Sequence, residues 1–288
     1  MRVLLTGASG FLGSAVRDEL VARGHEVLAA GRRPVGAGRA ADLSQPGAAA
    51  RLVDELAPEA VLHAAAMADI APCAADPVLA RRVNAEAPAE LATACARRGA
   101  RLLHVSTDQV FDGSRPGWRE EDEPAPLHEY GASKLAGERG VLAACPAALV
   151  VRTALLTGEA RGGRRSASSA LLELLARGGR PALFTDEWRT PLAVADAARA
   201  LADLLEREVC WRGPLPGAPG RILHLGGPER LSRLELGRRI AAAAGYDAEL
   251  CVGATRVDAG QTGRPADLSL DSRRCVALLG WTPRVLAG

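Results

Sequence analysis

Short apolar runs alternate with longer amphipathic stretches through the first half of this 288-residue chain. The apolar runs have the length of buried strands and lie at residues 3–5, 25–30, 60–63 and 101–105. The stretches between them have a helical period. The first of these stretches ends at residue 23, and the others cover residues 46–57 and 76–98. This alternation predicts an α/β fold with a doubly wound parallel sheet of the Rossmann type.

The pattern of apolar positions weakens after residue 153. The sequence predicts helices at residues 170–177, 194–206 and 232–245 and a strand at residues 221–225. An Arg- and Ser-rich loop at 161–169 and a Pro- and Gly-rich linker at 211–220 separate these elements. We therefore expect a dinucleotide-binding domain over residues 1–155 and a smaller mixed substrate-binding lobe over residues 156–288, partly interleaved with the sheet.

Three glycines mark the turn between the first strand and the first helix. Gly7, Gly10 and Gly13 follow the pattern G-x-x-G-x-x-G, which indicates a dinucleotide site in this position, although an ordinary strand–helix turn can carry it too. Gly7 allows a tight turn, Gly10 lets the backbone approach a diphosphate, and Gly13 lets the helix pack on the strand. The cofactor contacts expected from this turn and from the next strand ends are Gly7, Gly10, Phe11, Leu12, Gly13, Asp42, Leu43, Ala64, Ala65 and Ala66.

The residues after the second strand bear on the choice of cofactor. Sites that prefer NADH usually carry an acidic residue here for the ribose 2′-hydroxyl, whereas this chain has Arg32 and Arg33. Two guanidinium groups suit a 2′-phosphate, so the sequence favours NADPH and leaves NADH possible. Asp42 and Leu43 are expected to end a short third strand beside the adenine.

Tyr130 and Lys134 lie four residues apart in a segment with a helical pattern. On a helix these positions share one face, so the phenol and the ammonium can occupy one small site. A nearby cation favours the phenolate, and we expect it to lower the pKa of Tyr130 toward the working range of a proton donor. Lys134 is the only lysine among 36 lysine and arginine residues, and arginine does not replace a compact, titratable donor. The alternative is a helix on which the tyrosine packs and the lysine is solvated.

Polar residues follow the strand at 101–105, at the carboxyl end where parallel sheets bind ligands. The hydroxyl of Thr107 can hold a substrate carbonyl while Tyr130 protonates its oxygen. Asp108 can accept a hydrogen bond from a sugar hydroxyl or cap the turn. His63 and His104 lie in apolar strands, and we expect them to be core residues rather than ligands.

Several motifs resemble the dTDP-4-dehydrorhamnose reductase family of the extended short-chain dehydrogenase/reductase superfamily. They are the Gly-rich start, STDQVFDG, the E-x-D-x-P-x-P loop before YGASK, VRT at residues 151–153, and Arg264 followed by Pro265. The resemblance covers most of the chain and implies NADPH-dependent reduction of a keto group on a nucleotide-linked sugar. It implies that Thr107 orients the carbonyl, that Tyr130 donates the proton, and that Lys134 binds the cofactor ribose and tunes Tyr130.

The substrate contacts implied by the resemblance are Thr107, Asp108, Gln109, Arg189 and Arg264. A sugar diphosphate needs cations, and arginine offers a planar bidentate fork; Arg264 matches the Arg-Pro motif of the family, and Arg189 is a second candidate. The family usually has tyrosine where this chain has Gln109, and the related 4,6-dehydratases have glutamate there. Glutamine cannot titrate, which argues against dehydration and leaves the identity of the sugar open.

Two other functions are compatible with the same residues. An epimerase of this superfamily, with a transient hydride transfer, would use Thr107, Tyr130 and Lys134 as well. The regulatory beta subunit of methionine adenosyltransferase also resembles this family and serves mainly as a partner. Net consumption of NADPH would separate a reductase from an epimerase, and co-purification of a large partner would favour the regulatory role.

Composition and charge argue against several other classes. The net charge is +2 and the arginines are dispersed, so nucleic acid binding is not expected. No apolar run approaches the ~20 residues of a membrane span, and strand-like sequence begins at Arg2, which leaves no expected signal peptide. Six scattered cysteines without a C-x-x-C motif indicate reduced thiols in a cytoplasmic enzyme without a metal site. A homodimer is compatible with the sequence.

Overall fold

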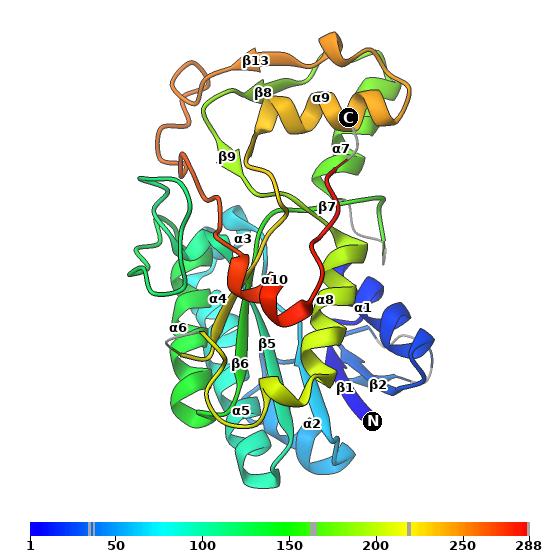
Figure 1. Cartoon of the computed structure of the whole chain (residues 1–288). Helices are drawn as coiled ribbons and strands as arrows, with labels where there is room; N and C mark the ends of the chain where they lie inside the picture. Colours follow the sequence, from blue (N-terminus) through cyan, green and yellow to red (C-terminus); the bar gives the residue numbers. More distant parts are fainter. Residues whose placement is uncertain (34–35, 37, 162–165, 218–219, 287–288) are drawn as a thin grey trace.

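A seven-stranded sheet forms the centre of the computed structural model, which describes residues 1–33, 36, 38–161, 166–217 and 220–286 (Figure 1). Its strand order is β11-β6-β5-β4-β1-β2-β3, and each neighbouring pair is parallel. The strands are β1 (Arg2–Thr6), β2 (Glu26–Gly31), β3 (Arg39–Ala40), β4 (Ala60–His63), β5 (Arg101–Thr107), β6 (Leu149–Thr153) and β11 (Ile222–Leu225). The predicted doubly wound sheet is confirmed, and its order reverses between β1 and β4.

Helices cover both faces of this sheet because side chains along each strand alternate between two cores. Val3 and Leu5 of β1 belong to one buried cluster, and Leu4 belongs to the other. The first cluster is completed by α1 (Phe11–Ala22), α8 (Val194–Glu206) and α10 (Arg273–Leu279). The second is completed by α2 (Ala48–Leu56), α5 (Ala87–Arg98) and α6 (Glu129–Ala144). The apolar runs of the strands are therefore continuous because both faces are buried.

The helix expected at residues 76–98 is divided by a π-helical turn. It consists of α4 (Pro77–Arg81), the π-helix η1 (Arg82–Glu86) and α5, and the short α3 (Ile70–Ala75) precedes it. The turn brings the backbone of Asn84 against α6, where a Cβ added to Gly137 would lie 2.1 Å from the Asn84 carbonyl oxygen. An apolar periodicity cannot show one extra residue in a helical turn, so the sequence pattern missed it.

A second group of elements lies above the sheet in Figure 1, beyond the carboxyl ends of the strands. It contains two small sheets and two helices: β8 (Ala182–Phe184) with β13 (Val252–Ala254), β9 (Trp188–Arg189) with β12 (Leu231–Ser232), α7 (Ala167–Ala176) and α9 (Arg233–Ala243). The pair β7 (Leu156–Thr157) and β10 (Leu192–Ala193) lies where the chain crosses to and from this group. The chain enters this group twice. It returns to the sheet with α8 and β11 after the first passage and with α10 after the second.

Some expected boundaries moved. The third strand ends at Ala40, before Asp42 and Leu43, and the Leu43 side chain packs in the core between β2 and α2, so the expectation that these two residues end the strand was wrong. Most of the expected loop at 161–165, and residues 218–219 of the expected linker, lie outside the described residues. Three short 3-10 turns complete the part of the chain that the structure describes: η2 (Asp108–Val110), η3 (Glu208–Cys210) and η4 (Ala248–Leu250).

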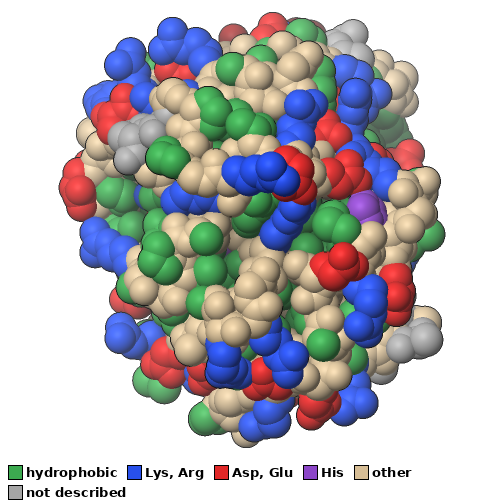
Figure 2. Space-filling view, turned by 60° about the horizontal axis from the view of Figure 1, so that its bottom comes forward, with side chains coloured by type: hydrophobic (Ala, Val, Ile, Leu, Met, Phe, Trp, Pro, Cys, Tyr) green, Lys and Arg blue, Asp and Glu red, His purple; other side chains and the backbone are tan. Residues whose placement is uncertain are grey.

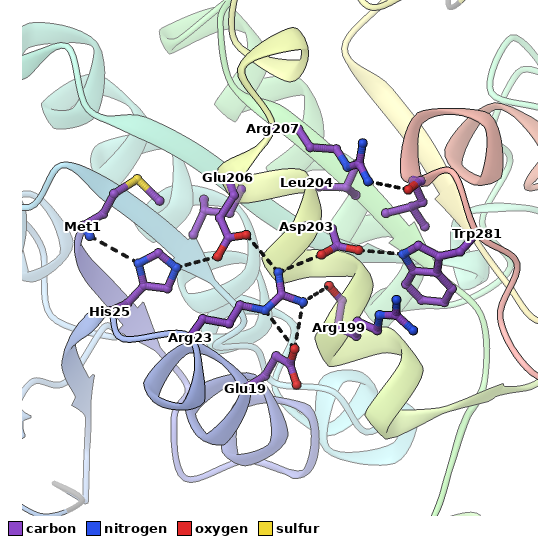
Figure 3. Close-up of polar contacts among 12 residues, drawn as sticks. Met1, Glu19, Arg23, His25, Arg199, Asp203, Leu204, Glu206, Arg207 and Trp281 are labelled. Carbon is purple, nitrogen blue, oxygen red and sulfur yellow. Dashed lines mark hydrogen bonds and ion pairs between the residues drawn. The ribbon is translucent and has the colours of Figure 1, made fainter.

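A charge network joins α1, α8 and the segment after α10 (Figure 3). Arg23 donates to Asp203 over 2.7 Å and to Glu206 over 2.9 Å. The Trp281 indole donates to the second oxygen of Asp203 over 2.6 Å, and His25 pairs with Glu206 over 2.6 Å. These contacts fasten the end of the chain to the first helix, on the face opposite α6.

The distribution of charged side chains and the state of the cysteines agree with what the composition predicts. Basic and acidic side chains are interspersed over the face shown in Figure 2. Within the described ranges, no helix is both long enough and apolar enough to cross a bilayer. All six cysteines are buried and free.

Candidate active site

The Gly-rich turn lies at the point where the strand order reverses, which is where such sheets bind nucleotides. Gly7 has a φ of +75°, and a Cβ there would lie 2.7 Å from the amide nitrogen of Ala65. A Cβ on Gly13 would lie 2.0 Å from the Gly7 carbonyl oxygen, so α1 can pack only with a glycine here. This cradle, with the first amides of α1 and half-buried Phe11 and Leu12 beside it, fits a dinucleotide diphosphate.

Arg32 and Arg33 lie directly after β2 and are exposed. Asp42 accepts a hydrogen bond from the Ser44 amide over 3.0 Å, and this bond, together with the charge of Arg32, lowers the pKa of Asp42. Arg32 and Asp42 therefore lie near each other at the edge of the sheet. Ala64 and Ala65 follow β4 and are half-buried against the glycine turn, while Ala66 is exposed.

Helix α6 brings Lys134 to the carboxyl end of β5. Its Nζ donates to the Val105 carbonyl oxygen over 2.7 Å and lies 3.3 Å from Nε2 of His104. Lys134 is 2% exposed, and this burial lowers its pKa to about 8, against the opposing charge of Glu138. The alternative of a solvated lysine is thereby excluded.

Tyr130 lies one turn before Lys134 on the same face of α6, with its phenol near the Thr107 hydroxyl. Burial raises the pKa of Tyr130 above its ordinary value, although the nearby Thr107 hydroxyl lowers it. The expectation that Lys134 would lower this pKa was wrong. Desolvation of the phenol outweighs the other influences, and the ammonium of Lys134 is bound to Val105 instead.

His63 and His104 are buried in adjacent strands, as expected of core residues, and their rings stack with centroids 5.2 Å apart. Burial lowers the pKa of both, to about 3 for His63, so both are neutral. His63 is bonded to Thr6 over 2.7 Å. His104 contacts Lys134, which places a neutral ring beside the ammonium.

The Thr107 hydroxyl is the centre of the hydrogen bonds at the end of β5. It donates to Oδ1 of Asp108 over 3.1 Å and accepts from the Gln109 amide over 3.2 Å. Thr107 therefore caps the turn η2, and Asp108 does not.

Three arginines surround one buried carboxylate above Asp108. Arg264 binds Glu187 through two nitrogens at 2.7 and 3.2 Å, Arg189 lies 3.2 Å from it, and Arg233 lies 3.8 Å from it. Burial opposes ionisation of Glu187, but the Arg264 hydrogen bond and the three cationic charges lower its pKa overall.

Asp108 connects this arginine group to the end of β5. It is 3% exposed, and burial raises its pKa to about 6 against the charge of Arg189, whose Nε is 3.8 Å from Oδ2. Among the described residues Oδ2 has no hydrogen-bond partner. The site thus holds three guanidinium groups and two carboxylates, which leaves a positive excess.

The Gln109 side chain binds His128. Nε2 of His128 lies 2.9 Å from Oε1 of Gln109, and both residues are half-buried. His128 precedes Tyr130 by two residues and was not singled out from the sequence. A polar side chain at the start of the Tyr–Lys helix was the available signal, because such residues cap helices.

Two further polar groups support α6 and were also missed. Glu138, one turn beyond Lys134, forms a buried ion pair with Arg152 of β6 and accepts a hydrogen bond from Ser106 over 2.5 Å. Asn84 of η1 binds both the amide and the carbonyl of Met67 and donates to Ser133 over 3.0 Å. Arg152, a charge inside the apolar run at residues 149–153, was a visible signal for the Glu138 ion pair. The contacts of Asn84 depend on the π-helical turn.

A Rossmann sheet with this glycine turn and a Tyr–Lys pair after the fifth strand defines an NAD(P)-dependent oxidoreductase of the extended short-chain dehydrogenase/reductase class. The particular family is shown by comparison. The chain belongs to the family of the RmlD substrate binding domain, whose model matches residues 1–285. The family predicted from the motifs is thereby confirmed.

Several known proteins are similar over most of the chain. A dTDP-4-dehydrorhamnose reductase of Mycobacterium tuberculosis is 37% identical over 98% of this chain and 88% of that protein. Methionine adenosyltransferase 2 subunit beta of Pongo abelii is 33% identical over 84% of this chain and 72% of that protein. A crystal structure of a Bacillus anthracis dTDP-4-dehydrorhamnose reductase in complex with NADP superposes with a TM-score of 0.84, at 25% identity over 98% of this chain and 94% of that chain.

Proposed function

We propose that this protein reduces a keto group on a nucleotide-linked sugar at the expense of NADPH. The observation that carries the proposal is the position of the Tyr130 phenol near Thr107 at the carboxyl end of β5, one helical turn from the buried Lys134. The phenol carries a proton that it can give to a substrate oxygen bound there. NADPH would supply the hydride that adds to the carbonyl carbon.

The chain's own residues supply the proton and the orientation. Thr107 can hold the carbonyl oxygen within reach of the Tyr130 phenol, and Tyr130 can pass its phenolic proton directly to that oxygen, which leaves a phenolate. The Lys134 ammonium, fixed on Val105, can bind the cofactor ribose and stabilise the phenolate that remains. The raised pKa of Tyr130 keeps the proton on the phenol at neutral pH until the substrate oxygen takes it.

The arginine group is the proposed binding site for the diphosphate of the sugar nucleotide. Arg264 and Arg189 are the residues expected from the sequence, and Arg233 adds a third cation beside the same Glu187. Their positive excess suits a doubly charged diphosphate, and Asp108 and Gln109 would lie toward the sugar.

For the cofactor, we propose contacts with Gly7, Gly10, Phe11, Leu12 and Gly13 at the diphosphate. Arg32 and Arg33 would bind the 2′-phosphate, Asp42 and Leu43 the adenine side, and residues 64–66 the nicotinamide half. The exposed side chains of both arginines after β2 favour NADPH over NADH. Bound NADP in the similar Bacillus anthracis structure supports this choice.

We also propose that residues 1–155 form the dinucleotide-binding domain and residues 156–288 the substrate-binding lobe. In the second part β11 belongs to the large sheet and α8 and α10 pack on it, while the small sheets, α7 and α9 form the lobe proper. A homodimer and a cytoplasmic location complete the proposal. The free cysteines support a reducing compartment, and light scattering at increasing protein concentration tests the dimer.

The experiment is an assay of NADPH consumption against a panel of nucleotide-linked keto sugars, with a matched pair of variants. Tyr130→Phe should lower turnover by roughly 10²–10⁴-fold, the contribution of a positioned proton donor. Tyr246→Phe is the control, since Tyr246 is the only other tyrosine and lies beside α9. Equal turnover in the two variants would refute the role of Tyr130.

The same assay separates the two alternatives. An epimerase would interconvert sugars without net oxidation of NADPH. A regulatory subunit like the methionine adenosyltransferase relatives would show no turnover and would instead bind a larger catalytic partner.

A further inference from the structure

His128 caps the helix that carries Tyr130 and Lys134. It is the residue before α6, with extended backbone angles, and its Nδ1 accepts a hydrogen bond from the Gly131 amide over 3.1 Å. Unpaired amides at the start of a helix need such an acceptor. A backbone amide can only donate, so Nδ1 must be unprotonated.

This contact fixes both the tautomer of His128 and the orientation of Gln109. With Nδ1 unprotonated, the neutral ring carries its proton on Nε2 and donates it to Gln109 over 2.9 Å. The atom of Gln109 that faces the ring is therefore the oxygen. The two amide hydrogens of Gln109 point away from His128.

The His128–Gln109 pair also contacts both Thr107 and Tyr130. The backbone amide of Gln109 donates to the Thr107 hydroxyl, and the Tyr130 phenol lies near that hydroxyl. On the helix side, the His128 ring lies parallel to the Tyr130 ring with centroids 6.2 Å apart. A Cβ on Gly131 would lie 2.2 Å from the Gln109 carbonyl oxygen, so the first turn of α6 packs tightly on the same residue.

We propose that His128 and Gln109 are positioning residues that hold Tyr130 against Thr107, and that they do so only while His128 is neutral. This inference rests on the proposed reductase function. The Gln109 side chain has its own partner in this protein, the His128 ring.

The neutral form of His128 is favoured by its surroundings. Burial lowers its pKa, and the cations of Arg264 and Arg189 from the substrate-binding lobe lower it further. The groups that contact the ring from η2 and α6, Gln109 and Tyr130, are uncharged at neutral pH. Below the pKa of His128 both ring nitrogens carry protons, so Nδ1 then faces the Gly131 amide donor to donor and the cap is lost. Turnover should therefore fall as the pH drops through that pKa.

Two substitutions separate this role from simple helix capping. Asparagine caps helices well but does not titrate and is too short to reach Gln109, so His128→Asn should retain the fold and abolish the acid limb of the pH–turnover profile. It should lower turnover at neutral pH by up to about 10²-fold, the effect of a misplaced reacting group, and leave NADPH affinity unchanged. Gln109→Glu places a carboxylate against Nε2, which favours the imidazolium and should move the acid limb to higher pH.

His25→Asn is the matched control, because His25 lies in the network of Figure 3 beside Glu206. Its pH profile should match that of the unmodified protein. An acid limb that persists in His128→Asn, or that stays in place in Gln109→Glu, would overturn the inference.

A second readout does not depend on turnover. In nitrogen-15 NMR spectra, the histidine signal that disappears in His128→Asn should report the Nε2-protonated tautomer at neutral pH. A proton on Nδ1, or a charged ring, would overturn the inference. If the protein consumes no NADPH with any keto sugar while this signal is as expected, the proposed function fails and the hydrogen-bonded pair stands.

Discussion

Replacing Glu138 with glutamine would leave the Arg152 cation buried without its counter-charge. Both side chains are only 2% exposed. Arg152 donates to Glu138 through Nε at 3.0 and 3.1 Å and through Nη2 at 2.7 Å. Glutamine retains one acceptor oxygen but places an amide donor against a guanidinium that can only donate.

The remaining neighbours of Arg152 do not restore the lost charge. Nη1 lies 3.4 Å from Nε2 of His224, and the guanidinium lies 5.0 Å from the centre of the Phe111 ring. His224 is neutral because burial lowers its pKa to about 3. Removal of one partner of a buried ion pair typically costs about 3–5 kcal/mol, and we expect Glu138→Gln to lose an amount in this range.

Urea unfolding followed by circular dichroism measures the loss. The exposed pair of Arg139 and Glu123, 3.2 Å apart, provides the control, and Glu123→Gln should change the free energy of unfolding by less than about 1 kcal/mol. The double variant Glu138→Leu with Arg152→Met removes both charges and should recover most of the loss. A loss below about 1 kcal/mol in Glu138→Gln would show that the Arg152 charge is compensated elsewhere, and the reasoning would be wrong.

Three further predictions concern binding. The pKa of Lys134 is about 8, so NADPH affinity, measured by titration calorimetry, should fall as the pH rises through that value and the ammonium is lost; constant affinity there contradicts a role in ribose binding. Arg264→Ala should raise KM for the sugar nucleotide by roughly 10-fold or more, as expected for one charge-assisted pair, and leave NADPH affinity intact, whereas Arg238→Ala at the surface ion pair with Glu249 should alter neither. Replacing Arg32 and Arg33 together with alanine should remove the preference for NADPH over NADH in binding assays, and an unmodified protein without that preference would contradict the assignment.

The secondary-structure elements and the shared helix face of Tyr130 and Lys134 could be predicted because they depend on local pattern. The strand at 60–63 and the helix at 194–206 have the bounds expected from apolar periodicity, and Tyr130 and Lys134 share a helix face through their spacing. Both depend on residues that are neighbours along the chain.

The groups that surround this pair could not be predicted in the same way. Glu187, Arg233 and Arg264 come from three separate segments, and only the packing of the lobe brings them together. The direction of the pKa shift of Tyr130 was missed for a related reason. Spacing shows that a cation is near, but it does not show how strongly the phenol is desolvated or that the cation is bound to a backbone carbonyl.

The solitary lysine has a practical consequence for chemical labelling. Lys134 carries the only side-chain amine of this chain, and that amine donates to the Val105 carbonyl oxygen of β5. An acylating reagent can modify that amine only when the helix separates from β5, so the rate of modification reports the opening of this helix at a single known atom. A lysine-specific endoprotease would likewise cut at one position of the unfolded chain, and two fragments would suffice to count the molecules that had opened.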